Sequence, residues 1–79
     1  MSKVVVLGAG QWGTTMAQVL CDAGNHVLMW GRSQELVDEV NQKHTNSKYL
    51  DESILPVGLK ATSSLAEAFE YSNIYVLAI

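Results

Sequence analysis

The sequence predicts an α/β fold, a parallel sheet with helices on both of its faces. Two observations lead to this prediction. Short apolar runs alternate with amphipathic stretches along the 79 residues, an order typical of right-handed strand–helix–strand crossovers. The first apolar run leads directly into the pattern Gly8-x-Gly10-x-x-Gly13, which is typical of a strand-to-helix turn. Together they favour a Rossmann-type sheet of strand order 3-2-1-4, the first half of a doubly wound fold with its switch point.

Two strands and two helices are predicted in the first half of the chain. The first strand holds three consecutive valines and a leucine, which suits a central parallel strand buried on both faces. Gly24 suits the left-handed position after the first helix, and Ser33 suits the N-cap of the second. The predicted elements are the strand Lys3–Leu7, the helix Thr14–Ala23, the strand His26–Trp30 and the helix Gln34–Lys43.

The second half begins with a polar stretch, residues 42–57, which predicts a loop with a helical end. Ser64 and Glu67 form a capping-box signature at the start of a third helix. The predicted elements are the strand Leu59–Thr62, the helix Leu65–Tyr71 and the strand Asn73–Ile79. An apolar parallel strand at a chain end leaves an unprotected sheet edge. We therefore expect the 79 residues to be the N-terminal piece of a longer protein.

Composition and charge exclude several classes of protein. The formal net charge is −3 and no basic stripe is present, so nucleic acid is not an expected partner. The single cysteine, Cys21, cannot form an internal disulfide, which fits a reducing compartment. We expect no metal site and no membrane span, because the sequence has neither a Cys–His cluster nor an apolar run of bilayer-spanning length.

Each glycine of the first turn has a role if the turn holds a dinucleotide. Gly8 would allow the tight turn out of the strand, and Gly10 would let a diphosphate approach the backbone. Gly13 would let the helix pack closely on the strand. The helix N-terminus would offer unpaired N–H groups and partial positive charge to the phosphates, even in an acidic chain. The alternative is a tight turn that binds no ligand.

The residues after the second predicted strand bear on which dinucleotide would bind. An NAD site usually carries an acid about 20 residues after the glycines, which bonds the ribose 2′-hydroxyl. Here the sequence reads Gly31-Arg32-Ser33. The guanidinium and the hydroxyl suit a 2′-phosphate, so the expected cofactor is NADP in preference to NAD. In the alternative interpretation, Arg32 is a solvated residue paired with Glu35.

These motifs together resemble one known family. The chain is similar to the N-terminal part of NAD(P)-dependent glycerol-3-phosphate dehydrogenases over nearly its whole length, in the stretches VLGAGQWGTTMA, HVLMWGR, NQKHTNSKYL, ILPVGLKATSSLAEAF and NIYVLAI. That family has a nucleotide-binding domain followed by a helical substrate domain. The resemblance implies that residues 1–79 are the N-terminal part of the dinucleotide-binding domain, and that the helical domain is absent from this chain.

The resemblance also implies an activity. Members of the family reduce dihydroxyacetone phosphate to sn-glycerol 3-phosphate with NAD(P)H, for glycerophospholipid synthesis, which implies a cytoplasmic enzyme. It implies a small phosphorylated substrate held by the missing domain, and a homodimer for the whole protein. The catalytic lysine and the substrate-phosphate ligands would follow Ile79, so no catalytic residue is expected here. The isolated chain is expected to have no turnover, even where it binds nucleotide.

By the same resemblance, Gln11 and Trp12 would lie beside the cofactor diphosphate. Trp12 would line the site and exclude water, or would anchor the loop by packing into the core. Arg32 and Ser33 would hold the adenosine ribose end, and Tyr49 would contact the cofactor. The expected cofactor-binding residues are Gly8, Gly10, Gln11, Trp12, Gly13, Arg32, Ser33 and Tyr49.

The chain departs from the family pattern at two places. Gln11 stands where a serine is frequent, which removes or alters one side-chain bond to phosphate. Asp51 and Glu52 stand where the family typically has a Pro-Gly turn.

Neither histidine has an acid–nucleophile arrangement nearby, so His26 and His44 are expected at the surface.

Two other interpretations remain open. A non-catalytic module that senses dinucleotides would share the fold, so the fold alone does not decide between binding and catalysis. A methyltransferase with a glycine-rich turn is disfavoured, because the acid that would bind the ribose hydroxyls is missing after the second strand.

Overall fold

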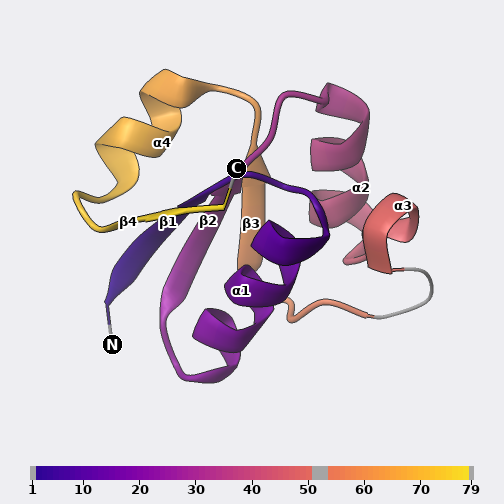
Figure 1. Ribbon diagram of the computed structural model, residues 1–79, viewed down its shortest axis with the longest axis horizontal. Coiled ribbons are helices and arrows are strands. Elements are labelled where there is room, and N and C mark those ends of the chain that lie inside the picture. Colours follow the sequence, from indigo (N-terminus) through magenta and orange to yellow (C-terminus); the bar gives the residue numbers. More distant parts are fainter. Residues whose placement is uncertain (1, 51–53, 79) are drawn as a thin grey trace.

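The computed structural model describes residues 2–50 and 54–78. Its sheet has four parallel strands in the order β3-β2-β1-β4, which confirms the predicted order 3-2-1-4 (Figure 1). The strands are β1 (Lys3–Leu7), β2 (His26–Trp30), β3 (Leu59–Thr62) and β4 (Tyr75–Leu77). Leu7 is in register with Trp30 and Leu77, and Trp30 with Thr62. The carboxyl ends of all four strands therefore form one edge of the sheet.

Helices cover both faces of this sheet, as the sequence predicts (Figure 1). The helices α1 (Gln11–Asp22) and α2 (Gln34–Lys43) pack on one face, and α4 (Leu65–Tyr71) contacts β1, β2 and β3 from the other. The main core lies under α1 and α2, because alternate strand side chains point to that face. It consists of Val6, Ala17, Val27, Met29, Val37, Val40, Leu55, Leu59 and Ala61.

Two predicted elements, the first helix and the last strand, differ from the structure in their bounds. α1 begins at Gln11, three residues before the predicted Thr14, because Gly10 takes the N-cap position and its carbonyl accepts from the Thr14 N–H at 2.9 Å. β4 is shorter than the predicted strand Asn73–Ile79, of which Ile79 lies outside the described residues. Backbone pairing of β1 with this segment still continues on both sides of β4. The Val5 N–H donates to Ile74 O, and the Ala78 N–H donates to Leu7 O.

Both predicted helix caps form. Ser33 Oγ accepts from the Leu36 N–H, and Ser64 Oγ accepts from the Glu67 N–H, each at 3.2 Å. The capping box differs in one bond. The Glu67 carboxylate accepts from the Thr62 hydroxyl, and the Ser64 N–H donates to Thr62 Oγ1 at 3.1 Å. The Thr62 hydroxyl thus lies between the Ser64 N–H and the Glu67 carboxylate, which bond each other directly in a capping box.

The predicted polar loop contains the single helical turn α3 (Ser47–Leu50) and an antiparallel bridge between Thr45 and Ile54. His26 is exposed, as expected, but the expectation for His44 was wrong. His44, which ends α2 in the left-handed conformation with φ 57°, is half-buried. The departure at Asp51 and Glu52 lies outside the described residues.

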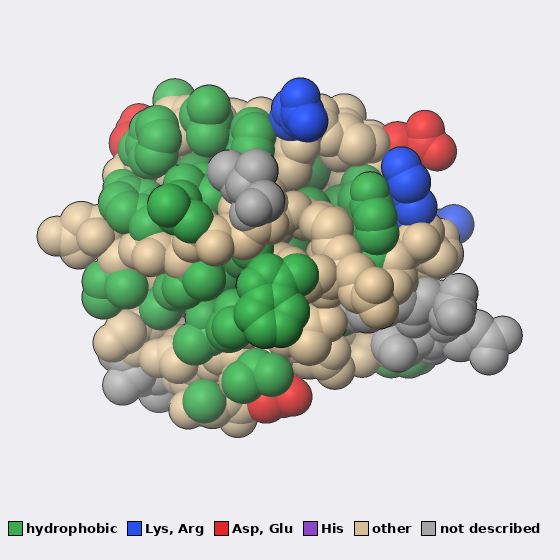
Figure 2. Space-filling view, in the orientation of Figure 1, with side chains coloured by type: hydrophobic (Ala, Val, Ile, Leu, Met, Phe, Trp, Pro, Cys, Tyr) green, Lys and Arg blue, Asp and Glu red, His purple; other side chains and the backbone are tan. Residues whose placement is uncertain are grey.

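Apolar side chains remain exposed around α4 and β4. Phe69 is 54% exposed and Leu77 is 72% exposed, and Leu65, Ile74 and Tyr75 are also exposed. Figure 2 shows hydrophobic side chains gathered on this side of the molecule. The Phe69 and Tyr75 rings meet edge to face, with their centroids 5.8 Å apart. Apolar surface around α4 and β4 is therefore left uncovered by the described residues.

Candidate functional site

A hollow of about 570 Å³ opens at the carboxyl edge of the sheet. It lies between the turns that follow β1 and β2, where doubly wound sheets hold their ligands. Five of the eight expected cofactor-binding residues line it, and Gln11, Trp12 and Gly13 do not. The lining residues are Gly8, Ala9, Gly10, Trp30, Gly31, Arg32, Ser33, Leu36, Tyr49 and Ala78.

Gly8 and Gly13 bring the first strand and α1 together beneath this hollow. Gly8 has φ 133°, and a Cβ there would lie 2.5 Å from Ala78 O, so a side chain is excluded by conformation and by space. A Cβ on Gly13 would overlap the Gly8 carbonyl. The close strand–helix packing predicted for Gly13 is therefore present.

Gly10 has a different surrounding. A Cβ on Gly10 would meet no atom closer than Tyr49 Cε1 at 4.0 Å, so it would project into open space beside the hollow. Gly10 caps α1 without a side-chain hydrogen bond, and the first turn of α1 carries no acidic residue. The unpaired N–H groups and the positive end of the helix dipole are thus left for a bound anion. The site fits the diphosphate of a dinucleotide on this ground.

Arg32 and Ser33 form the opposite side of the hollow, where β2 leads into α2. Both residues are exposed. Ser33 Oγ accepts the Leu36 N–H, so its hydroxyl hydrogen can still donate to a ligand. Arg32 makes no ion pair with Glu35 in the part of the chain that the structure describes. The guanidinium is therefore available to a ligand.

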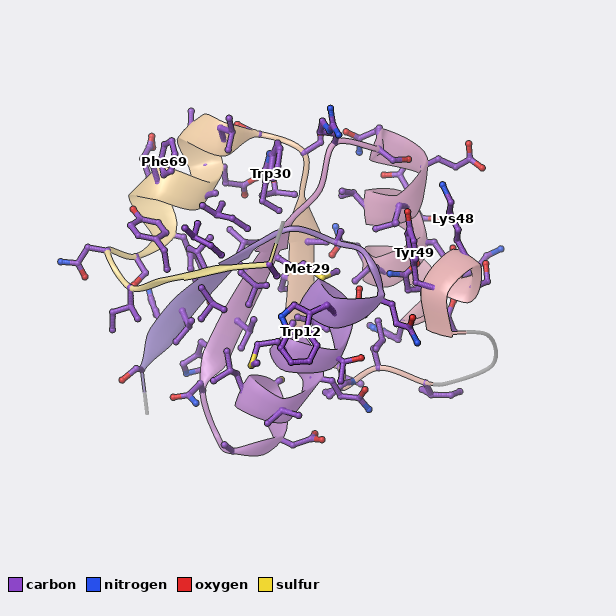
Figure 3. The ribbon with its side chains drawn as sticks, viewed as in Figure 1. Trp12, Met29, Trp30, Lys48, Tyr49 and Phe69 are labelled. Atoms are coloured by element: carbon purple, nitrogen blue, oxygen red, sulfur yellow. The ribbon has the colours of Figure 1, made fainter. Side chains whose placement is uncertain are left out.

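Tyr49 lies on α3 and is 37% exposed, with the Lys48 ammonium 5.3 Å from its ring centroid (Figure 3). The segment before α3 is held to α2 through Glu39. The Glu39 carboxylate accepts from Thr45 Oγ1 at 2.7 Å and from the Ser47 N–H at 2.8 Å. The hydrogen bond from Thr45, and then that from Ser47, holds the pKa of Glu39 below its ordinary value.

Gln11 and Trp12 lie in the first turn of α1, and both are exposed. Trp12 is 65% exposed, and Figure 3 shows it on α1, apart from Tyr49. The alternative in which Trp12 anchors the loop by packing into the core is therefore wrong, because the ring faces outward from the first helical turn. Contact between these two residues and a cofactor stays a prediction.

Sequence reasoning missed several residues of the site. Gly31 is buried, and a Cβ there would lie 2.7 Å from Ala9 Cβ, so the turn after β2 closes directly on the glycine turn. Asn46 is 0% exposed, and its Nδ2 donates to Ala9 O and to Thr14 Oγ1. Neither periodicity nor charge marks Asn46 as buried, because it stands in a polar stretch that reads as solvated loop.

Two other kinds of site have no candidate among the described residues. Among residues 2–50 and 54–78, no cluster of His, Cys, Asp or Glu side chains is arranged to hold a metal ion. No helix within those ranges has both the length and the apolarity to cross a bilayer.

The sequence matches a family model described as NAD-dependent glycerol-3-phosphate dehydrogenase N-terminus, over residues 3–79. Among curated proteins, it is 48% identical over 79 residues to a glycerol-3-phosphate dehydrogenase [NAD(P)+] of Staphylococcus carnosus. It is 46% identical over 77 residues to the protein of that name from Streptococcus uberis. The match covers 100% and 98% of this chain, but only 24% and 23% of those relatives.

Solved structures give a similar result. A glycerol-3-phosphate dehydrogenase from Saccharomyces cerevisiae superposes with a TM-score of 0.89 at 33% identity, over 98% of this chain and 26% of that one. The Coxiella burnetii enzyme superposes with a TM-score of 0.86 at 33% identity, over 95% of this chain and 23% of that one.

Proposed function

The chain belongs to the NAD-dependent glycerol-3-phosphate dehydrogenase family, and from this premise we propose that it forms the cofactor-binding part of such an enzyme. The reaction is the reduction of dihydroxyacetone phosphate to sn-glycerol 3-phosphate with NAD(P)H. One observation carries the proposal, the 570 Å³ hollow in which Gly10 leaves open space at the N-terminus of α1. A diphosphate fits there because the backbone N–H groups are unpaired and no side chain intervenes.

The bound cofactor would supply the hydride, and this chain would bind and orient it. Backbone groups at Gly10 and in the first turn of α1 would receive the diphosphate, next to Gln11 and Trp12, while Gly8 and Gly13 keep β1 and α1 close together. Tyr49 covers the hollow from α3. Groups that stabilise charge on the substrate carbonyl come from outside this chain, so the chain alone provides proximity without proton transfer.

The proposed cofactor is NADP in preference to NAD. Arg32 and Ser33 line the hollow, Arg32 makes no ion pair with Glu35 among the described residues, and both lie at the start of α2. A 2′-phosphate would find a guanidinium and a hydroxyl donor there, whereas a carboxylate at this place would repel it.

The proposal extends to the whole protein. Residues 1–79 would be the N-terminal part of a dinucleotide-binding domain, and a helical domain outside this chain would hold the small phosphorylated substrate. Such an enzyme would act as a homodimer in the cytoplasm and supply the glycerol backbone of phospholipids. The support is the family match and the length of the relatives, of which the chain spans 23–24%.

Calorimetry tests the binding step. Titration of the folded chain with NADPH and with NADH should give saturable binding of both coenzymes, with the lower dissociation constant for NADPH. A well-folded chain that gives no heat with either one would contradict the proposal.

A second assay tests the division of labour. The 79-residue chain should not reduce dihydroxyacetone phosphate, whereas a longer protein carrying it should. Turnover by the chain alone would show that catalytic groups lie within these residues. Nucleotide binding by the longer protein without turnover would favour a sensing module instead.

A further inference from the structure

Asn46 joins the α2–α3 loop to the glycine turn from inside the protein. Its side chain is fully buried, and its Nδ2 donates to Ala9 O at 3.1 Å and to Thr14 Oγ1 at 2.8 Å. Thr14 is also fully buried, and its hydroxyl donates to the same Ala9 oxygen at 3.2 Å. The Ala9 carbonyl therefore receives two side-chain donors, one from α1 and one from a loop 37 residues away.

The orientation of this carbonyl fixes the orientation of the next amide. The described residues include no cis peptide, so the Ala9–Gly10 bond is trans and planar, and its C=O and N–H point in opposite directions. Asn46 and Thr14 hold the C=O on the interior side. The Gly10 N–H is thereby turned away from the interior, on the side where Gly10 lines the hollow.

Asn46 also holds Tyr49, another residue that lines the hollow, through its backbone. The Asn46 carbonyl accepts from the Tyr49 N–H at 3.1 Å, which closes the single turn of α3. Tyr49 lies next to Gly10, since its Cε1 would be 4.0 Å from a Cβ there. Asn46 thus helps to set both the direction of the Gly10 N–H and the position of the Tyr49 ring beside it.

We propose that Asn46 is a positioning residue for the dinucleotide: through the Ala9 carbonyl it pre-orients the Gly10 N–H toward the diphosphate. This inference rests on the proposed function. A buried polar group normally satisfies all its hydrogen-bonding atoms, but Asn46 Oδ1 has no partner within residues 2–50 and 54–78. The amide is therefore placed for its two donors at the expense of its acceptor, as expected where the orientation of one carbonyl matters more than local stability.

Dissociation constants of NADH and NADPH test this role in the full chain, measured on variants whose folding is verified by circular dichroism. Asn46→Ala should raise both constants by about tenfold, the effect of misdirecting one charge-assisted hydrogen bond. Both coenzymes should be affected alike, because the diphosphate is common to them. Thr14→Val, which keeps the volume of the side chain, should weaken both in the same direction, and Thr14→Ser should restore binding.

Asn41 provides a matched control. Its side chain also makes two hydrogen bonds, from Nδ2 to Ala61 O at 2.9 Å and from the Ala61 N–H to Oδ1 at 2.8 Å. Ala61 does not line the hollow, whereas Ala9, which accepts from Asn46, does. Asn41→Ala should lower the melting temperature and leave both dissociation constants unchanged. Without ligand, the amide chemical shifts of Gly10 should move in Asn46→Ala but not in Asn41→Ala, because only the first substitution frees the Ala9–Gly10 peptide to turn.

The outcomes separate the two proposals. If the wild-type chain binds dinucleotide while Asn46→Ala and Thr14→Val bind it equally well, the positioning role is wrong and the proposed function stands. If Asn41→Ala weakens binding as much as Asn46→Ala, the effect is general destabilisation and the positioning role is again wrong. If the folded wild type binds neither coenzyme, both proposals fail together.

Discussion

The hollow has two walls, one formed by backbone and the other by exposed side chains. The wall at the start of α1 is backbone, held by contacts that leave no room for a side chain at Gly8 or Gly13 and by the buried Asn46–Thr14 pair. The wall at the start of α2 consists of the exposed side chains of Arg32 and Ser33. A rigid wall suits the diphosphate that NAD and NADP share, and an exposed wall suits the 2′-position at which they differ. Changes in the first wall should therefore weaken the binding of both coenzymes, and at the tightly packed Gly8 and Gly13 they should also impair folding. Changes in the second wall should affect selectivity.

The largest effect is expected at Gly13. In Gly13→Ala the new Cβ would overlap the Gly8 carbonyl, and backbone meeting backbone can be relieved only by separating α1 from β1. We expect the free energy of unfolding to fall by up to about 3 kcal/mol. Urea denaturation measures this, with Gly58→Ala as the control, because the nearest atom to a Cβ there is Cys21 Sγ at 3.5 Å. Equal stability of the two variants would mean that the strand–helix contact is not tight.

Gly10→Ala should separate binding from folding within the backbone wall. The added Cβ clashes with nothing described in the protein but enters the space proposed for the diphosphate. We expect both NADH and NADPH to bind about tenfold more weakly or worse, as the loss of a charge-assisted hydrogen bond implies. The melting temperature should change little. Calorimetric titration and a thermal melt measure the two properties, and undiminished affinity would place the diphosphate elsewhere.

Arg32→Ala tests the exposed wall. NADPH affinity should fall about tenfold with the loss of one charge-assisted contact to phosphate, whereas NADH affinity should hardly change. Raising the salt concentration should reduce the wild-type preference for NADPH, because an exposed charge pair is screened. An equal loss for both coenzymes would remove the basis for the NADP preference.

The smallest effect is expected at Glu39, which supports the segment carrying Tyr49 without lining the hollow. Hydrogen bonds from Thr45 and Ser47 lower the pKa of Glu39 in the folded chain from its ordinary value of 4.5. A lowered folded-state pKa contributes stability above pH 4.5 that is lost as the pH falls through the lowered value. Glu39→Gln should thus lower the free energy of unfolding by less than about 1 kcal/mol at pH 7, because the group is near the surface, and by progressively less as the pH falls below 4.5. A difference that persists at low pH would point to a cause other than the charge.

The sequence predicts the strands, the helices and the glycine turn better than it predicts the polar contacts that join distant segments. Short apolar runs identify all four strands, because a parallel strand that is buried on both faces consists of consecutive apolar residues. The side-chain caps at Ser33 and Ser64 are also visible, since each depends on residues three apart. The sequence predicts too late a start for α1, because Gly10 caps the helix through its backbone and no side chain marks such an end.

Long-range polar contacts escape this kind of reasoning. Asn46 reaches the glycine turn across 37 residues, and only the folded chain brings the two together. The position of Trp12 was ambiguous for a related reason, because an aromatic residue in a first helical turn can face either way. Its 65% exposure depends on how α1 is rotated against the sheet.

The hollow has one more consequence, which comes from Gly8 and Ala78 both lining it. Because Gly8 follows β1 and Ala78 follows β4, the complete hollow forms only when both strands are paired in the folded sheet. Occupancy is then thermodynamically linked to completeness of the whole sheet. At a coenzyme concentration one hundred times the dissociation constant, mass action should add about 2.7 kcal/mol to the free energy of unfolding. The bound cofactor would thereby stabilise the folded chain against unfolding.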